Sequence, residues 1–141
     1  MKRANGECYD CDAPAITGQQ TCEIHRDARR IHKKRANIAR KRLVLDQYGG
    51  VCQCCGEHRI EMLTVDHVDG GGSTHRKVVG SGNTFHQWLK RNKFPPGFQV
   101  LCFNCNCSKG ANRECPHVAE RRNKIFYTGI HNDSPVNVGM E

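Results

Sequence analysis

The stretch FQVLCFNCNC, residues 98–107, joins a strand-like run to two cysteines that are two residues apart. A matching pair lies in VCQCCG at 51–56. A two-residue gap lets both sulfurs of a pair turn onto one metal ion, so two pairs can supply a tetrahedral Cys₄ zinc site. The pairs are 46 residues apart, whereas an ordinary zinc ribbon has about 15–20. We therefore expect a closed, structural zinc that joins the two ends of an inserted module, with ligands Cys52, Cys55, Cys102 and Cys105.

A second ligand set lies near the N-terminus, in a polar, turn-rich segment. Its two knuckles are separated by ten residues that contain turn-forming Asp, Pro and Gly. Three thiolates and one imidazole make a Cys₃His set, and the repeated two-residue spacing argues against unrelated reduced cysteines. We expect a small zinc finger over residues 1–25, with ligands Cys8, Cys11, Cys22 and His25.

Three cysteines remain: Cys54, Cys107 and Cys115. Cys107, Cys115 and His117 could form a third metal site, but this set is one good ligand short. Buried or incidental thiols are the preferred interpretation. The sequence therefore predicts two structural zinc ions.

Composition limits the class of protein. The chain has 141 residues, of which 37% are hydrophobic, and ten cysteines. So thin a core usually requires metal ions or disulfides for stability. No apolar run reaches membrane-span length and the first residues lead into no signal segment, so we expect a cytoplasmic protein in which paired cysteines bind metal. The net charge of +8 favours a polyanionic partner, with nucleic acid as the leading candidate and no membrane partner.

Helix formers without Gly or Pro fill residues 26–48, so we expect a linker helix there, ended by Gly49 and Gly50. Nine Lys or Arg residues fall between positions 26 and 42. Its apolar residues are expected roughly on one side of the helix: Ala28, Ile31, Ile38, Ala39, Leu43 and Leu45.

The region 49–127 is expected to form the second domain. The pattern predicts a strand over 63–67, a glycine-rich loop over 69–82, a helix over 83–94 capped by Asn83, and a strand over 98–102. Further helices are expected from near Cys105 and from Pro116 to about 127, followed by a flexible tail, 128–141.

The two cysteine pairs enclose TVDHVDGGGSTHRK, residues 64–77. Together, VCQCCG, LTVDHVDGGGSTHRK and FQVLCFNCNCSKG resemble the zinc-carrying, phage-type group of HNH endonucleases, over residues 48 to about 117. The N-terminal CYDCDAPAITGQQTCEIH is similar, more weakly, to small fingers that precede such domains. The resemblance implies a small α+β fold with a zinc-stapled ββα-metal core. It also implies a phage-encoded protein that acts in the host cytoplasm.

The family's functional residues transfer by position. The resemblance implies that His67 is the general base, that Asp66 is the acidic metal ligand, and that Asn106 is the other metal ligand. One position departs from the pattern, because the family's middle Asn is replaced by the run Pro96, Gly97 and Phe98. In the family this Asn commonly holds the loop in place, so its absence puts that loop contact in doubt more than the hydrolytic chemistry.

The chemistry of these residues agrees with that assignment. Phosphodiester hydrolysis needs an activated water, a Lewis acid on the phosphoryl oxygens and a stabilised leaving oxygen. An imidazole can accept the proton of water near neutral pH. A carboxylate and an amide oxygen form a hard, incomplete ligand set, so Mg²⁺ or Mn²⁺ is the expected catalytic ion.

Basic residues are expected to contact the phosphates. One group lies on the glycine-rich loop and one on the linker helix, where acidic residues are few. The alternative for both groups is a solvated charged surface. The candidates are Arg29, Arg30, Lys33, Lys34, Arg35, His75, Arg76 and Lys77.

The leading hypothesis is therefore a metal-dependent endonuclease that nicks or cuts DNA, expected to be duplex. A zinc-stapled nucleic-acid-binding module without catalysis is the alternative from a different class. Cleavage of RNA is a third possibility. The sequence leaves open the target, nicking against double-strand cutting, and the oligomeric state, including a homodimer.

Overall fold

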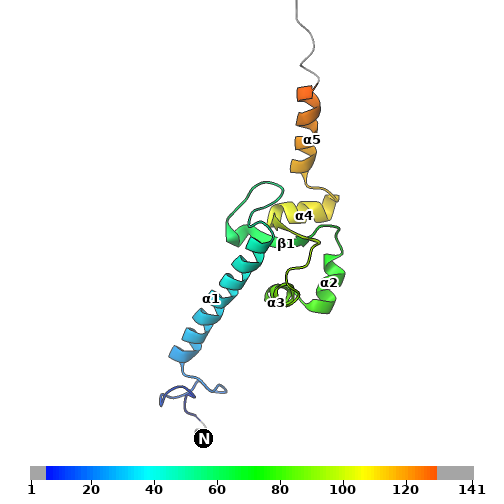
Figure 1. Ribbon diagram of the computed structural model, residues 1–141. Helices are drawn as coiled ribbons and strands as arrows, with labels where there is room; N and C mark the ends of the chain where they lie inside the picture. The colour runs from blue at the N-terminus through cyan, green and yellow to red at the C-terminus, as the bar shows by residue number, and fades with distance from the viewer. Residues whose placement is uncertain (1–5, 130–141) are drawn as a thin grey trace, which may run out of the picture. The chain divides into compact units, whose positions relative to one another are not determined.

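The computed structural model describes the backbone of residues 6–129 and the side chains of residues 6–123. The predicted tail therefore lies mostly outside the described residues. The chain divides into two compact units, Met1–Arg42 and Leu43–Glu141. In the described part the protein is a small α+β structure with five α-helices, one short 3-10 helix (η1, Ile60–Met62) and a two-stranded sheet (Figure 1).

The first unit contains a short turn structure and most of helix α1, Glu23–Gln47. An isolated bridge pairs Glu7 with Pro14, and the amide of Cys8 donates to the carbonyl of Ala13 at 2.9 Å. These bonds close the first knuckle of the N-terminal ligand set. The amide of Tyr9 donates to the carbonyl of Gln20 at 2.8 Å and brings this knuckle to the segment just before the second. Helix α1 begins three residues before the predicted start.

The expected apolar side of helix α1 is mostly in solvent. Ile31 and Ile38 are 54% and 46% exposed, and Leu43 is 39% exposed. Only Val44 and Leu45, near the C-terminal end, are buried. The apolar spacing of the sequence was correct for a helix, but no side chain in the middle of the helix is buried.

The second unit is built on strands β1, Leu63–His67, and β2, Phe98–Cys102, which match their predicted ranges. They pair antiparallel, so that Leu63 lies opposite Cys102 and His67 opposite Phe98. Helix α4, Phe103–Asn112, follows β2 directly and packs against both strands. Cys102 caps this helix, because its sulfur accepts the amide of Cys105 at 3.4 Å.

Two short helices lie between strands β1 and β2 in the sequence. Helix α2, Gly72–Val79, occupies the middle of the segment predicted to be a loop. The glycines misled that prediction: Gly70 and Gly71 have positive φ and form the turn before the helix. Helix α3, Asn83–Arg91, begins where predicted, but Gly82 rather than Asn83 is its N-cap.

Helix α5, Pro116–Gly129, begins at the proline that the sequence marked and extends two residues past position 127. The apolar core of the second unit collects side chains from the end of α1, both strands and α3. Its most deeply buried members are Val44, Leu45, Leu63, Leu89, Val100 and Cys105. No helix in the described part of the chain is long and apolar enough to cross a membrane.

Candidate functional site

A groove of about 720 Å³ lies beside the end of strand β1. One wall comes from the turn and first residues of helix α2, and the other from helix α4. Asp66 and Asn106, 40 residues apart in sequence, both line it. The remaining lining residues are Val68, Asp69, Gly70, Gly71, Gly72, Ser73, Arg76, Cys107, Lys109, Gly110 and Arg113.

The carboxylate of Asp66 is held in a network of polar contacts. Its Oδ2 accepts from Gln99 Nε2 at 2.9 Å and from Lys109 Nζ at 2.6 Å. The same ammonium donates to the backbone carbonyls of His67, at 2.7 Å, and Val68, at 2.8 Å. Three oxygens therefore converge on one positive charge at the groove. Sequence analysis missed Lys109, although it lies one helical turn after Asn106.

His67 lies in an aromatic environment. Its ring is stacked on Phe85 at 5.7 Å and meets Phe98 edge-on at 4.8 Å between ring centroids. Its Nε2 is 2.8 Å from Nδ1 of His75. Burial lowers the pKa of His67 below its usual value, and the charge of His75 acts in the same direction, while Asp66 raises the pKa. The neutral imidazole is therefore favoured.

The other ring nitrogen of His67 faces Gly72. A Cβ at position 72 would lie 2.9 Å from His67 Nδ1 and 3.2 Å from Arg76 Nη1, closer than real Cβ atoms allow without movement. Gly72 and Arg76 both line the groove. Glycine at this position thus leaves room beside Nδ1, although His67 itself is not among the residues that line the groove.

The expected phosphate-contact residues have different surroundings. His75 is half-buried against Trp88, with ring centroids 4.5 Å apart, so it is bound to His67 and not free on a loop. Arg76 and Lys77 are exposed on helix α2. On helix α1, Arg29, Arg30, Lys33, Lys34 and Arg35 are all exposed. Arg29 pairs with Asp10 at 2.6 Å, and Arg30 lies 3.8 Å from Asp27.

The N-terminal ligand set is assembled as predicted. Nδ1 of His25 lies 3.4 Å from the sulfurs of Cys8 and Cys11 and 3.3 Å from that of Cys22. Burial raises the pKa of the Cys8 thiol. Backbone hydrogen bonds from Cys22, Asp10 and Cys11 lower this pKa by more than burial raises it, and the net pKa is about 6. A thiolate is therefore favoured near neutral pH, which is the form that binds metal.

The Cys₄ set is also brought together. Its four sulfurs lie within 4.8 Å of one another, and those of Cys55 and Cys102 are 3.7 Å apart. Burial raises the pKa of Cys52, but backbone hydrogen bonds, the first of them from Cys102, bring it down to about 7. None of the ten cysteines, all of which lie among the described residues, forms a disulfide. Both predicted four-ligand sets could therefore hold zinc.

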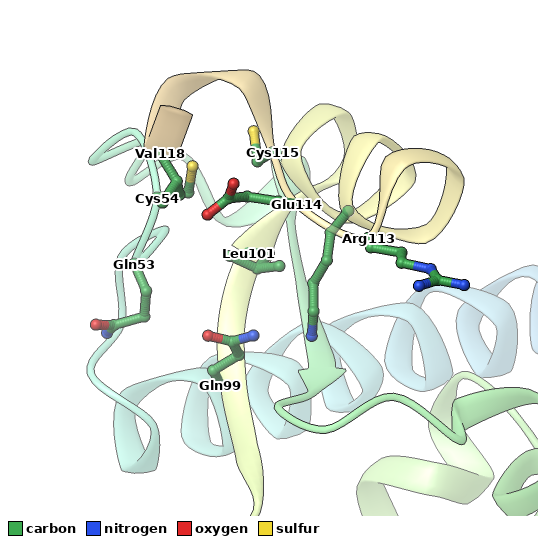
Figure 2. Close-up of a pocket in the computed structure, with 9 residues that line it drawn as sticks. Gln53, Cys54, Gln99, Leu101, Arg113, Glu114, Cys115 and Val118 are labelled. Atoms are coloured by element: carbon green, nitrogen blue, oxygen red, sulfur yellow. The ribbon is translucent and has the colours of Figure 1, made fainter. Parts of the chain in front are cut away.

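A third ligand set is formed by Cys54, Cys105, Cys115 and His117. It contains Cys115 and His117 of the third site that the sequence left open, but Cys54 and Cys105 in place of Cys107. Cys107 belongs to none of the three sets found among the described residues, and it is exposed. A cavity of about 200 Å³ lies beside the third set. Figure 2 shows Cys54 and Cys115 together at one end of this cavity, with Gln53 and Gln99 toward the other end.

No family model, no curated protein and no solved structure matches this chain. The site must therefore be interpreted from its own geometry.

Proposed function

We propose that the protein is a metal-dependent HNH endonuclease that hydrolyses phosphodiester bonds of DNA. The observation that carries the proposal is the groove shared by Asp66 and Asn106. His67 does not line the groove, but its Nδ1 lies beside Gly72, which does. The order of two antiparallel strands and a helix, β1, β2 and α4, is compatible with the ββα-metal core that the sequence resemblance implies.

The residues at the groove suit a divalent cation. Asp66 Oδ2 and two backbone carbonyls already surround the ammonium of Lys109. Oxygen donors of this kind suit Mg²⁺ or Mn²⁺. We propose that Asp66 and Asn106 would hold such an ion in place of that contact. The ion would polarise the phosphoryl group and stabilise the leaving 3′-oxygen.

In this mechanism His67 is the general base. Nδ1 accepts a proton from a water molecule as the water oxygen attacks phosphorus and the bond to the 3′-oxygen breaks. The 3′-oxygen leaves and takes a proton from solvent, which gives 5′-phosphate and 3′-hydroxyl ends.

His75 is a positioning residue in this proposal. If Nδ1 of His67 is to accept a proton, its Nε2 must carry the hydrogen and donate it to Nδ1 of His75, 2.8 Å away. That hydrogen bond fixes both the tautomer and the ring orientation of His67. Trp88 and Phe85 in turn hold the ring of His75, with centroids 4.5 and 5.7 Å away.

The partner that fits the charge distribution is duplex DNA. Arg76 and Arg113 line the groove, and the exposed cations of helix α1 add positive charge in the other unit. Such contacts bind the phosphate backbone without reading sequence.

The main test compares His67→Ala with His58→Ala, an exposed histidine outside the groove and the three ligand sets. Zinc-loaded protein is incubated with supercoiled plasmid, with and without Mg²⁺ or Mn²⁺. We expect Mg²⁺-dependent nicking, unchanged in His58→Ala and reduced about 10²–10⁴-fold in His67→Ala. Equal nicking by both variants would refute the role of His67, and no nicking by the wild type with either ion would refute the nuclease.

Two further variants test the orientation of His67. Gly72→Ala places a methyl group 2.9 Å from Nδ1, so the His67 ring or the helix must shift and nicking should fall. The higher helix propensity of alanine should offset part of the loss in thermal stability. His75→Gln keeps a hydrogen-bond acceptor and should retain more activity than His75→Ala. If both His75 variants cut like the wild type, His75 does not position His67.

The ion pair of Asp66 with Lys109 also supports the second candidate, a zinc-dependent nucleic-acid-binding module without catalysis. An ammonium that permanently neutralises the carboxylate would leave no place for a catalytic ion. This candidate predicts a salt-sensitive gel shift of duplex DNA without nicking in Mg²⁺ or Mn²⁺. Parallel reactions on RNA of the same sequence test whether RNA is the substrate.

A further inference from the structure

The third ligand set and the Cys₄ set have one residue in common. Cys105 belongs to both, whereas every other ligand belongs to one set only. Cys105 is fully buried at the first turn of helix α4, between the two groups of side chains. The remaining ligands of the third set come from the Cys52–Cys55 knuckle and from the start of helix α5, so three distant segments meet at this sulfur.

The distances within the third set are those of a metal site. Nδ1 of His117 lies 3.5 Å from the sulfurs of Cys105 and Cys115, and 3.8 Å from that of Cys54. Zinc bonds of about 2.3 Å to sulfur and about 2.0–2.1 Å to nitrogen give tetrahedral edges of about 3.5 Å between sulfur and nitrogen. The distances from Nδ1 of His25 to the sulfurs of the N-terminal set, 3.3–3.4 Å, are similar.

These side chains cannot supply two separate four-coordinate sites unless the sites share a ligand. The two sets contain seven different residues, one fewer than two independent tetrahedral sites require. A thiolate sulfur has more than one lone pair, so it can bind two ions at once. With Cys105 shared, each ion has four protein ligands and no open position.

We propose that Cys105 bridges two zinc ions in a binuclear centre. One ion is bound by Cys52, Cys55, Cys102 and Cys105, and the other by Cys54, Cys105, Cys115 and His117. Six thiolates and two divalent ions leave a net charge of about −2. The guanidinium of Arg121 partly offsets this charge, because it donates to the backbone carbonyl of Cys54 and lies 4.0 Å from its sulfur.

The centre has a structural consequence. Helix α5 begins at Pro116, and Val118 in its first turn packs against the core, whereas His117 is exposed. The second ion would fasten this start to the base of the sheet and to the Cys52–Cys55 knuckle. This role is independent of the proposed nuclease activity, so a chain that cuts no DNA would still contain the centre.

The first experiment counts metal ions in the full chain by native mass spectrometry and elemental analysis. We expect three zinc ions per chain: two in the binuclear centre and one in the N-terminal set. Cys115→Ser should contain two. Cys107→Ser is the matched control, because Cys107 is an exposed cysteine outside all three sets, and it should keep three. Two ions in the wild type, with no loss in Cys115→Ser, would overturn the proposal, as would iron in place of zinc.

The second experiment tests the bridge itself. The zinc ions are exchanged for a spin-half cadmium isotope and the metal NMR spectrum is recorded. Two of three resonances should split each other through the shared sulfur. Cys115→Ser should remove that splitting, whereas Cys11→Ser should remove the third, unsplit resonance and leave the splitting in place. Three resonances without splitting would show three separate sites and overturn the bridge.

Discussion

The N-terminal cluster and the cysteine-rich base of the second unit have similar ligands but different surroundings. Among the described residues up to position 42, the buried side chains are Cys8, Thr21 and Cys22, of which two are ligands. In the second unit, cysteines are buried together with a cluster of leucine, valine and phenylalanine side chains. The ligands of the first region span 18 residues, from Cys8 to His25, whereas those of the second come from segments more than 60 residues apart.

If both regions bind zinc, as their ligand sets allow, this difference predicts two uses of the metal. Where almost no apolar surface is buried, metal binding must supply most of the folding free energy. Where an apolar core exists, metal and core share that role.

Removal of zinc should have the largest effect on folding. The loss of structure should be greater in the N-terminal cluster than in the second unit. Binding of structural zinc contributes about 10–16 kcal/mol in small zinc domains, so a strong chelator should unfold residues 8–22 completely. Amides of β2 should keep part of their protection, because Val100 and Leu101 remain in an apolar cluster. Hydrogen exchange followed by mass spectrometry measures both regions in one sample. Equal loss of protection in the two regions would contradict the comparison.

A core substitution should act on the second unit alone. Leu89→Ala removes a fully buried side chain and should lower the free energy of unfolding by about 2–5 kcal/mol. Ile38→Ala is the matched control on helix α1, where the side chain is 46% exposed, and it should change stability by less than about 0.5 kcal/mol. Urea unfolding of zinc-loaded protein measures both. A large effect of Ile38→Ala would reveal a partner surface for helix α1.

The ion pair of Lys109 with Asp66 at the groove should contribute more to stability than the pair of Arg29 with Asp10 in the first unit. Lys109→Met removes three hydrogen bonds to a half-buried carboxylate and two carbonyls. Loss of a hydrogen bond to a charged group costs about 1.5–3 kcal/mol, so unfolding should shift by that order. Added Mg²⁺ should recover part of the loss if the ion takes the place of the ammonium. Thermal unfolding with and without Mg²⁺ measures both effects, and no recovery would count against a cation at Asp66.

The smallest effect is expected for Arg29→Ala. The guanidinium pairs with Asp10 at 2.6 Å, but the two side chains are 57% and 33% exposed. Exposed pairs contribute about 0–1 kcal/mol, so zinc affinity of the N-terminal set should stay within about fivefold of the wild type. Competition with a chromogenic chelator measures the affinity. A larger loss would mean that the pair holds the finger against helix α1.

Local spacing explains which parts of the fold were predictable. A two-residue gap between ligands restricts their sulfurs to one side of a turn, so the Cys₃His and Cys₄ sets could be grouped from sequence. Short apolar segments bounded by turn formers likewise located both strands. The glycine cluster at 70–72 hid helix α2, because two glycines that form a turn cannot be distinguished by composition from a longer loop.

The sequence by itself determined the two strands, most helices, the two four-ligand sets and the candidate residues Asp66, His67 and Asn106. Only the tertiary structure decided that Lys109 contacts Asp66, that His75 contacts His67, and that Cys54, Cys115 and His117 meet at Cys105. Each of these contacts depends on strand register and on how helices α2, α4 and α5 are placed. Sequence spacing restricts geometry only over a few residues, whereas contacts between distant segments are fixed by the packing of the whole unit.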